Sequence, residues 1–71
     1  MALTQTNTVV IYNTQKQVYS TKSSKILDLG VMLNKAINAA VVLCKETSQV
    51  VFIDAFVAGT RVAFHRVDSD R

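Results

Sequence analysis

Residues 24–46 read SKILDLGVMLNKAINAAVVLCKE, and this stretch decides the fold that the sequence predicts. Apolar residues recur in it at i, i+3, i+4 and i+7, which is the pattern of an amphipathic helix. The predicted apolar stripe consists of Ile26, Leu29, Gly30, Leu33, Ala36, Ile37, Ala40, Val41 and Cys44, widened by Met32, Ala39 and Leu43. The stretch therefore predicts one long helix that buries one of its sides.

The predicted helix has suitable residues at both ends. Ser23 or Ser24 is the expected N-cap, because a serine hydroxyl accepts a hydrogen bond from a free backbone N–H group. Asp28 near the start and Lys45 near the end both have the charge that the helix dipole favours. Gly30 lies at the edge of the apolar stripe, so either another element passes close to it or a glycine is simply tolerated there.

Three apolar residues fall on the polar side of this helix, namely Leu27, Val31 and Val42. Scattered apolar residues are common on protein surfaces, and this is the simpler interpretation. Apolar residues gathered on one side of a helix can also contact a second subunit. We therefore keep these three residues as candidates for a protein interface.

Four segments around the helix predict strands because they are rich in β-branched and aromatic residues. They are residues 7–12 (NTVVIY), 17–20 (QVYS), 50–57 (VVFIDAFV) and 60–67 (TRVAFHRV). Residues 13–16 and 58–59 predict turns, and Gly59 can take the positive φ that a tight turn requires. The order is hairpin, helix, hairpin, unless the first hairpin is one long bent strand.

The fold class that follows is α+β, with an antiparallel sheet of three to four strands and one long helix packed on one face. The 71 residues are expected to form a single small domain. Residues 1–6 are expected to be a flexible arm, and residues 68–71 a polar tail. Residues 21–23 are expected to link the first hairpin to the helix.

The register of the strands decides which side chains share a face. With a two-residue turn at 58–59, the face under the helix is predicted to hold Val9, Ile11, Val18, Val51, Ile53, Ala55, Val62 and Phe64. The opposite face is then predicted to hold Val10, Tyr12, Gln17, Tyr19, Phe52, Asp54, Phe56, Arg61, Ala63 and His65. A three-residue turn would instead place Asp54 in the core, where an unpaired carboxylate is costly.

One helix covers one face of such a sheet, so the other face is the candidate functional surface. Aromatic and arginine side chains are frequent anchors of protein interfaces. The predicted interface residues on this face are Tyr12, Tyr19, Phe52, Asp54 and Phe56. We expect a small binding protein that contacts another protein or its own copy as a homodimer, in the role of an adaptor, inhibitor or accessory protein.

The alternative function is nucleic-acid binding, because aromatic rings can stack on bases while nearby cations hold phosphates. The net charge of +3 and the sequence pI near 9.4 are compatible with this alternative. Its candidate residues are Lys16, Lys22, Lys25, Phe52, Phe56, Arg61 and His65. Asp54 counts against it, since a carboxylate at the centre of the face repels phosphate.

The sequence offers little for catalysis. Cys44 is expected to face the core while His65, the single histidine, faces away, so a Cys–His–Asp set with Asp54 is not expected. One histidine and one cysteine are too few for a metal site, and no cofactor or small-molecule ligand is implied.

Two further features of the sequence point to the cytoplasm. No apolar run has the length of a membrane span, and no secretion signal is visible. We therefore expect a cytoplasmic protein, or one in the host cytoplasm if it is viral. The small size suits a viral, phage or plasmid accessory protein.

Overall fold

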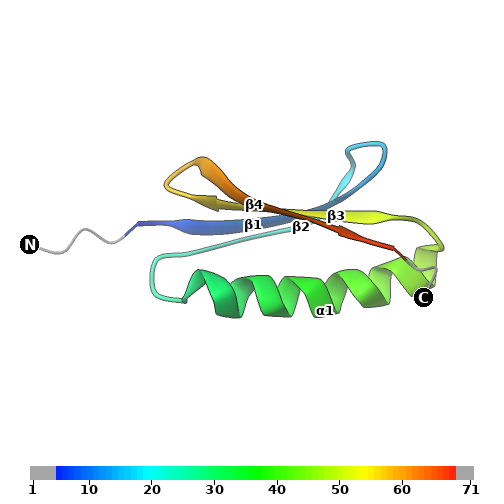
Figure 1. Cartoon of the computed structure of the whole chain (residues 1–71), viewed down its shortest axis with the longest axis horizontal. Helices are drawn as coiled ribbons and strands as arrows, with labels where there is room; N and C mark the ends of the chain where they lie inside the picture. The colour runs from blue at the N-terminus through cyan, green and yellow to red at the C-terminus, as the bar shows by residue number, and fades with distance from the viewer. Residues whose placement is uncertain (1–4, 69–71) are drawn as a thin grey trace, which may run out of the picture.

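A computed structural model describes residues 5–68 of the chain. In this part the elements are β1 (Asn7–Asn13), β2 (Val18–Ser24), α1 (Leu29–Thr47), β3 (Val51–Val57) and β4 (Thr60–Val67). The strands form an antiparallel sheet in the order β2-β1-β3-β4, and α1 lies against one face of it (Figure 1). The predicted α+β fold of two hairpins and an intervening helix is confirmed, in its four-stranded form.

The core lies between α1 and the central strands. The helix contributes one buried residue per turn, because residues four apart lie on the same side of a helix. The buried apolar residues are Met32, Ala36, Ala40 and Cys44 of α1 with Val9, Ile11, Val51, Ile53 and Ala55 of the sheet. The helical side of the core is therefore narrower than the predicted stripe, and Val41 is 36% exposed.

The helix begins later than the sequence pattern predicted. Asp28 is the N-cap, and its Oδ2 accepts a hydrogen bond from the Gly30 N–H at 3.0 Å. Ser24 lies at the end of β2, where its Oγ accepts from the N–H groups of Ile26 and Leu27 at 3.1 and 3.0 Å. The predicted start after Ser23 or Ser24 is wrong because Ser24 caps a separate turn, and Ile26 is 92% exposed instead of buried.

Gly30 is close to the capping side chain and not to another strand or helix. A Cβ atom at this position would lie 2.9 Å from the Asp28 Oδ2. The glycine thus leaves room for the carboxylate that caps the helix, which neither interpretation of Gly30 had anticipated.

The C-terminal end of α1 is attached to the sheet by polar contacts. Ser48 takes a left-handed conformation, with φ of 56°, and its N–H donates to the Cys44 carbonyl at 2.8 Å. The buried Cys44 thiol lies 3.0 Å from the carbonyl oxygens of both Gln49 and Val67. At the other end, the Asn7 side chain donates to the Leu27 carbonyl at 2.9 Å. Both ends of the helix are therefore fixed relative to the sheet.

The β1–β2 turn is organised by Asn13, which is buried. Its Oδ1 accepts from the N–H groups of Gln15 and Gln17, both at 2.9 Å. Lys16 completes the turn with a φ of 67° and donates its N–H to the Asn13 carbonyl. The first hairpin is confirmed and the single bent strand is excluded, but residues 21–23 belong to β2 and do not form a link.

The chain ends are described only in part. The Thr6 carbonyl accepts a hydrogen bond from the Ala58 N–H at 2.9 Å, so the end of the predicted arm is attached to the sheet. Residues 1–4 of that arm and residues 69–71 of the predicted tail lie outside the described residues. Within residues 5–68, no helix has the length and apolar character to cross a membrane.

The β3–β4 turn has two residues, as predicted. Ala58 and Gly59 have φ values of 51° and 85°, and Val57 pairs with Thr60. Two successive residues with positive φ are the feature of a type I′ turn, which suits the twist of a hairpin. The three-residue alternative is excluded.

Two β-bulges change the predicted register. One lies at Val62, because Phe56 pairs with Arg61 whereas Ala55 pairs with Ala63. The other lies at Tyr19, because Tyr12 pairs with Val18 whereas Ile11 pairs with Ser20. Since a shift of one residue turns every following side chain to the other face, six of the predicted placements were wrong. Phe64 and Val18 lie on the side away from α1. Ala63, His65 and Tyr19 lie on the helix side, and the bulge residue Val62 is 53% exposed instead of buried under the helix.

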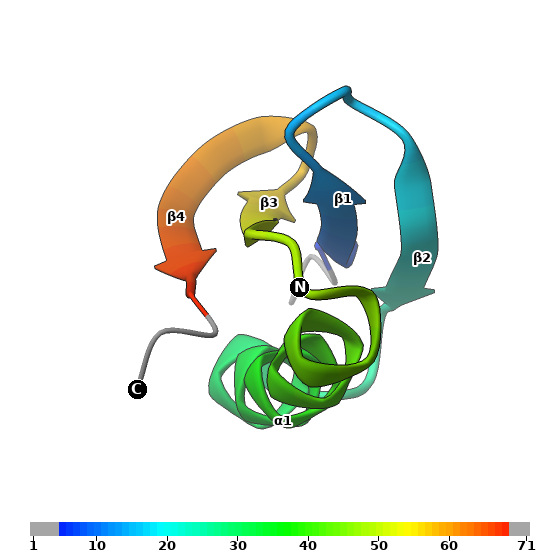
Figure 2. The ribbon, with the colours of Figure 1, turned by 90° about the vertical axis from the view of Figure 1, so that its right-hand side faces the viewer.

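The sheet is strongly twisted. Both hairpin turns rise away from α1, at opposite corners of the sheet (Figure 1). The ends of β2 and β4 bend toward α1 at the other two corners (Figure 2). This right-handed twist is the normal twist of β-structure, and it gives the face opposite α1 the shape of a saddle.

Candidate binding face

The face of the sheet opposite α1 has a regular arrangement that follows from the strand pairing. We call it the aromatic face and define it by three rows of residues that run across β2, β1, β3 and β4. The rows are Val18–Tyr12–Phe52–Arg66, Thr21–Val10–Asp54–Phe64 and Ser23–Thr8–Phe56–Arg61. The face thus carries aromatic side chains on its central strands, around Asp54, and arginines along β4.

Three rings of this face, Tyr12, Phe52 and Phe64, contact one another in series. The centroids of Tyr12 and Phe52 are 5.5 Å apart with an interplanar angle of 30°. Those of Phe52 and Phe64 are 5.7 Å apart at 21°. Phe52 and Phe64 are stacked and Tyr12 is tilted against Phe52, and both centroid distances lie within the range of favourable aromatic pairs. Phe64 is the last ring of this series and is 49% exposed, which leaves a large apolar side chain in contact with water.

Asp54 lies at the centre of the aromatic face. Its side chain is 15% exposed, and Arg61 Nη1 is 3.6 Å from its Oδ1. This distance allows an ion pair but exceeds that of a good hydrogen bond. The Oδ1 atom is buried and has no hydrogen-bond partner among residues 5–68. This oxygen is therefore held by the charge of Arg61 and not by a hydrogen bond.

Arg61 connects the acidic and aromatic parts of the face. Its guanidinium carbon lies 5.8 Å from the centroid of the Phe64 ring, within the range of a cation–π contact. The side chain is 58% exposed, so water screens much of its attraction to Asp54. Arg61 thus has one side against the face and one side available to a partner.

Tyr12 is the titratable ring of the aromatic face. Burial raises the pKa of its hydroxyl, and hydrogen bonding to the Asp54 carboxylate and the charge of that carboxylate raise it further. The positive charge of Arg61 acts in the opposite direction. Both the burial and the carboxylate therefore favour the neutral, protonated tyrosine.

Two hollows flank Tyr12 on this face. One of about 280 Å³ is lined by Val10, Tyr12, Lys16, Val18, Asp54, Phe56 and Arg61. The other, of about 290 Å³, is lined by Tyr12, Asn13, Thr14, Lys16, Phe52 and Phe64. They give the aromatic face enough relief to accept side chains from another surface.

The predicted protein-interface residues fall into separate groups. Tyr12, Phe52, Asp54 and Phe56 lie together on the aromatic face. Tyr19 does not join them, because it is the extra residue of the β2 bulge and packs against the core. The remaining candidates, Leu27, Val31 and Val42, are 44%, 45% and 53% exposed and lie on or just before α1, remote from this face.

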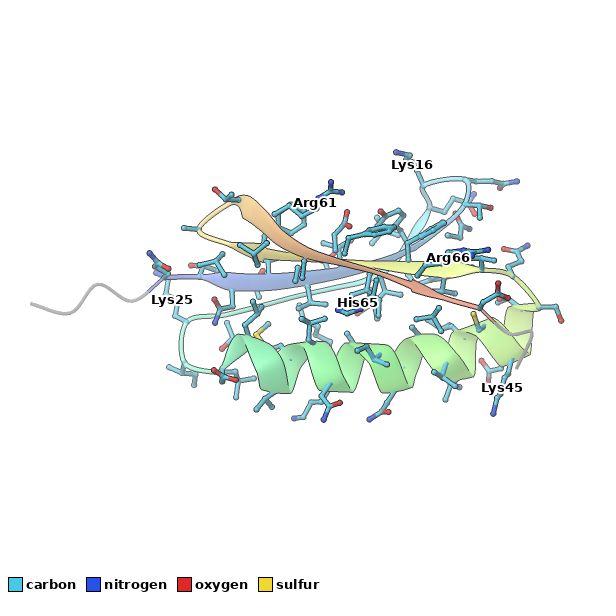
Figure 3. The ribbon with its side chains drawn as sticks, in the orientation of Figure 1. Lys16, Lys25, Lys45, Arg61, His65 and Arg66 are labelled. Carbon is cyan, nitrogen blue, oxygen red and sulfur yellow. The ribbon has the colours of Figure 1, made fainter. Side chains whose placement is uncertain are left out.

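The predicted nucleic-acid residues are also divided. Lys16, Phe52, Phe56 and Arg61 lie on the aromatic face or in the adjacent turn (Figure 3). The other three do not. Lys22 pairs with buried Val9 and so shares its side of the sheet, Lys25 follows β2, and His65 lies on the helix side (Figure 3). The structure thus gathers part of the predicted cationic set.

Phe64 and Arg66 are the aromatic and the charged residue of the aromatic face that the sequence interpretation missed. The sequence contained a signal for their position, because Phe64 and Arg66 are two residues apart and must share a face of a regular strand. Placing Phe64 under the helix would also have placed the Arg66 guanidinium there. That conflict between an apolar and a charged residue indicated a bulge earlier in the strand.

The residues once considered for catalysis lie on both sides of the sheet. His65 was expected to face away from Cys44, and this is wrong because the bulge at Val62 turns it to the helix side. The Cys44 thiol contacts backbone carbonyls, and Asp54 lies on the opposite face. Within residues 5–68, no three His, Cys, Asp or Glu side chains are placed to bind a metal ion together.

Comparison with protein-family models, with characterised proteins and with solved structures found no match to this chain.

Proposed function

We propose that this is a non-catalytic binding protein that acts through contact of its aromatic face with another protein surface. The observation that carries the proposal is the series of contacting rings Tyr12, Phe52 and Phe64, which ends in a half-exposed phenylalanine. A sheet normally buries its apolar sides against another layer, and here α1 supplies a layer on one side. A partner protein would supply the other. A cytoplasmic location and an accessory role belong to the same proposal.

The composition of the aromatic face supports a protein partner. Protein interfaces have aromatic and arginine residues in their centre and few lysines there. The rows of this face hold four aromatic side chains and two arginines, while Lys16 lies in the turn beyond them. Arg61 is already held near Asp54 and Phe64, so less side-chain freedom would be lost on binding.

Nucleic-acid binding remains the second candidate, because Lys16, Arg61 and Arg66 lie on the same side of the sheet as the rings (Figure 3). Two features weaken it. Arg61 pairs with Asp54, and Arg66 Nη2 lies 3.2 Å from the Asp68 Oδ2. Two of the three cationic side chains are therefore already paired with a carboxylate. Phe52 and Phe64 also stack on each other, which leaves less of their ring surface for bases.

The proposal is tested by photo-crosslinking in the cells that make the protein. A photoreactive phenylalanine analogue replaces Phe64 in one variant and Asn38, on the exposed side of α1, in the other. We expect discrete protein adducts from position 64 and none of these from position 38. Equal adducts from both positions, or none from position 64, would contradict a binding role for the aromatic face.

The second candidate is tested separately by titration with fluorescent single-stranded oligonucleotides. Binding through Lys16, Arg61 and Arg66 would weaken steeply as the salt concentration rises, because phosphate contacts release counterions. It would also weaken in Phe64→Ala, where a stacking surface is lost. Absence of binding at low salt would end this candidate and leave the protein-binding proposal untouched.

A further inference from the structure

The saddle shape of the aromatic face is complementary to itself. The hairpin turns form its two raised corners, and the ends of β2 and β4 form its two lowered corners (Figures 1 and 2). A half-turn about an axis in the plane of the sheet brings raised corners over lowered ones. This holds for an axis parallel to the strands and for an axis perpendicular to them. A second copy of the chain can therefore cover the whole face, as packed sheets do at about 10 Å separation.

The charges on the face distinguish the two axes. A half-turn about the axis perpendicular to the strands places each strand over the same strand of the second copy and reverses the order of the three rows. Asp54 then faces Asp54 of the second copy, and Arg61 faces its Arg66. Like charges that face each other across an interface are strongly unfavourable. This orientation is therefore disfavoured.

An axis parallel to the strands keeps the rows and places β1 over β3, and β2 over β4, of the second copy. The pairs that then face each other are Tyr12 and Phe52, Val10 and Asp54, Thr8 and Phe56, Thr21 and Phe64, Ser23 and Arg61, and Val18 and Arg66. No charged side chain in the three rows faces another charge. Both copies use the same surface, so the contact closes as a dimer and cannot extend into a fibre.

We infer that the partner of the aromatic face is a second copy of this chain, packed sheet against sheet about a two-fold axis parallel to the strands. This inference rests on the proposed function, since it names the protein that the aromatic face contacts. The resulting homodimer has four layers, helix, sheet, sheet and helix, and buries Phe64 of each copy against Thr21 of the other.

The first test is the mass of the protein in sedimentation equilibrium from micromolar to millimolar concentration. Phe64→Asp is compared with Val42→Asp, because the two side chains are similarly exposed, at 49% and 53%, on opposite sides of the molecule. We expect the wild type to dimerise, Phe64→Asp to weaken the dimer by at least about 30-fold, and Val42→Asp to leave it unchanged. Circular dichroism checks the fold of each variant, and Thr21→Asp is the second face variant should Phe64→Asp not fold.

The second test concerns the axis, through the exposed residue Ser23. In the proposed dimer Ser23 faces Arg61 of the other copy, so Ser23→Asp should strengthen the dimer by about threefold and Ser23→Lys should weaken it by a similar factor. Under the perpendicular axis Ser23 faces Val18, and the two substitutions would change the dissociation constant alike. That second result would overturn the proposed axis.

The results also separate this inference from the proposed function. A monomeric wild type whose position 64 still crosslinks to a different protein would overturn the second-copy partner and leave the binding function in place. A monomer without any adduct would overturn both. A dimer dissolved by Val42→Asp and not by Phe64→Asp would move the contact to the outer side of α1 and overturn the inference.

Discussion

Arg61 and Asp54 form an ion pair across neighbouring strands, with Nη1 and Oδ1 3.6 Å apart at the centre of the aromatic face. The two-residue turn pairs Arg61 with Phe56 and so places Arg61 on the same side as Asp54, and the bulge at Val62 then turns Phe64 to that side as well. The pair explains how an acidic residue is tolerated on an otherwise apolar and cationic surface. Its energetic contribution can be measured.

Replacing Arg61 with glutamine should lower the free energy of unfolding by about 0.5–1 kcal/mol at low salt, because the guanidinium is 58% exposed and partly screened by water. High salt should reduce this difference, since screening weakens such pairs. Urea unfolding at two salt concentrations measures both effects. Arg66→Gln is the matched control, because both side chains of its pair with Asp68 are exposed and a smaller loss is expected. A loss that does not depend on salt would exclude an electrostatic origin.

The N-terminal cap of α1 gives a second prediction. Asp28→Ala should destabilise the protein by about 1 kcal/mol, the usual cost of losing a capping side chain. Ser24→Ala should cost less, because Ser24 caps an exposed turn outside the helix. Thermal unfolding followed by circular dichroism compares the two variants. A larger loss for Ser24→Ala would restore the original prediction that Ser24 caps the helix.

Gly30 should be coupled to this cap. Alanine is favoured over glycine inside a helix by up to about 1 kcal/mol, but its Cβ would lie 2.9 Å from the Asp28 Oδ2. Gly30→Ala should therefore stabilise the protein less in the wild type than in the Asp28→Ala variant. A double-mutant cycle measures the difference, and additive effects would show that the carboxylate moves aside freely.

The β3–β4 turn offers a stabilising substitution. Ala58 has a φ of 51° at the first central position of a type I′ turn, where asparagine followed by glycine is the preferred sequence. Ala58→Asn should raise the free energy of unfolding by about 0.5–1 kcal/mol. Ala58→Val should lower it, because a β-branched residue resists positive φ. Denaturant unfolding distinguishes them, and equal effects would contradict the assigned turn.

Tyr12 predicts a dependence of stability on alkaline pH. Its pKa is raised in the folded protein, so the folded state keeps the hydroxyl proton at a pH where the unfolded chain has lost it. The stability that the protonated Tyr12 hydroxyl contributes is fully present below the unfolded pKa of about 10, and this contribution is lost as the pH rises through the folded pKa. Tyr12→Phe should therefore lose stability less steeply than the wild type above pH ~10. Urea unfolding at neutral and alkaline pH tests this, and parallel pH profiles would contradict it.

Local sequence patterns predicted much of the fold. The i, i+3, i+4 recurrence of apolar residues located α1, and alternating β-branched and aromatic residues located the strands. Both signals report a single element and the side that it buries, so they do not depend on distant contacts. The Ala58–Gly59 turn belongs to the same class, because its length and conformation are set by two residues.

The candidate site was predicted only in part, for a reason that Phe64 and His65 illustrate. Each lies on the opposite face from the one predicted, because Val62 is an extra residue in β4. The bulge at Val62 contains no glycine that would have marked it in the sequence. Tyr19 was misplaced by the same effect at the second bulge. A sequence with two-residue periodicity specifies the faces only as long as the pairing is uninterrupted.

The sequence by itself determined the helix, the strands and their order, because these follow from local periodicity. It also determined that one side of the sheet is left uncovered, because a single helix can cover only one of the two faces of a sheet. The tertiary structure alone decided that Phe64 and Arg66 join Tyr12, Phe52 and Asp54 on that side, while His65 and Tyr19 leave it. The physical reason is that strand pairing is non-local: partners across the sheet set where a bulge falls, and each bulge reassigns every side chain that follows it.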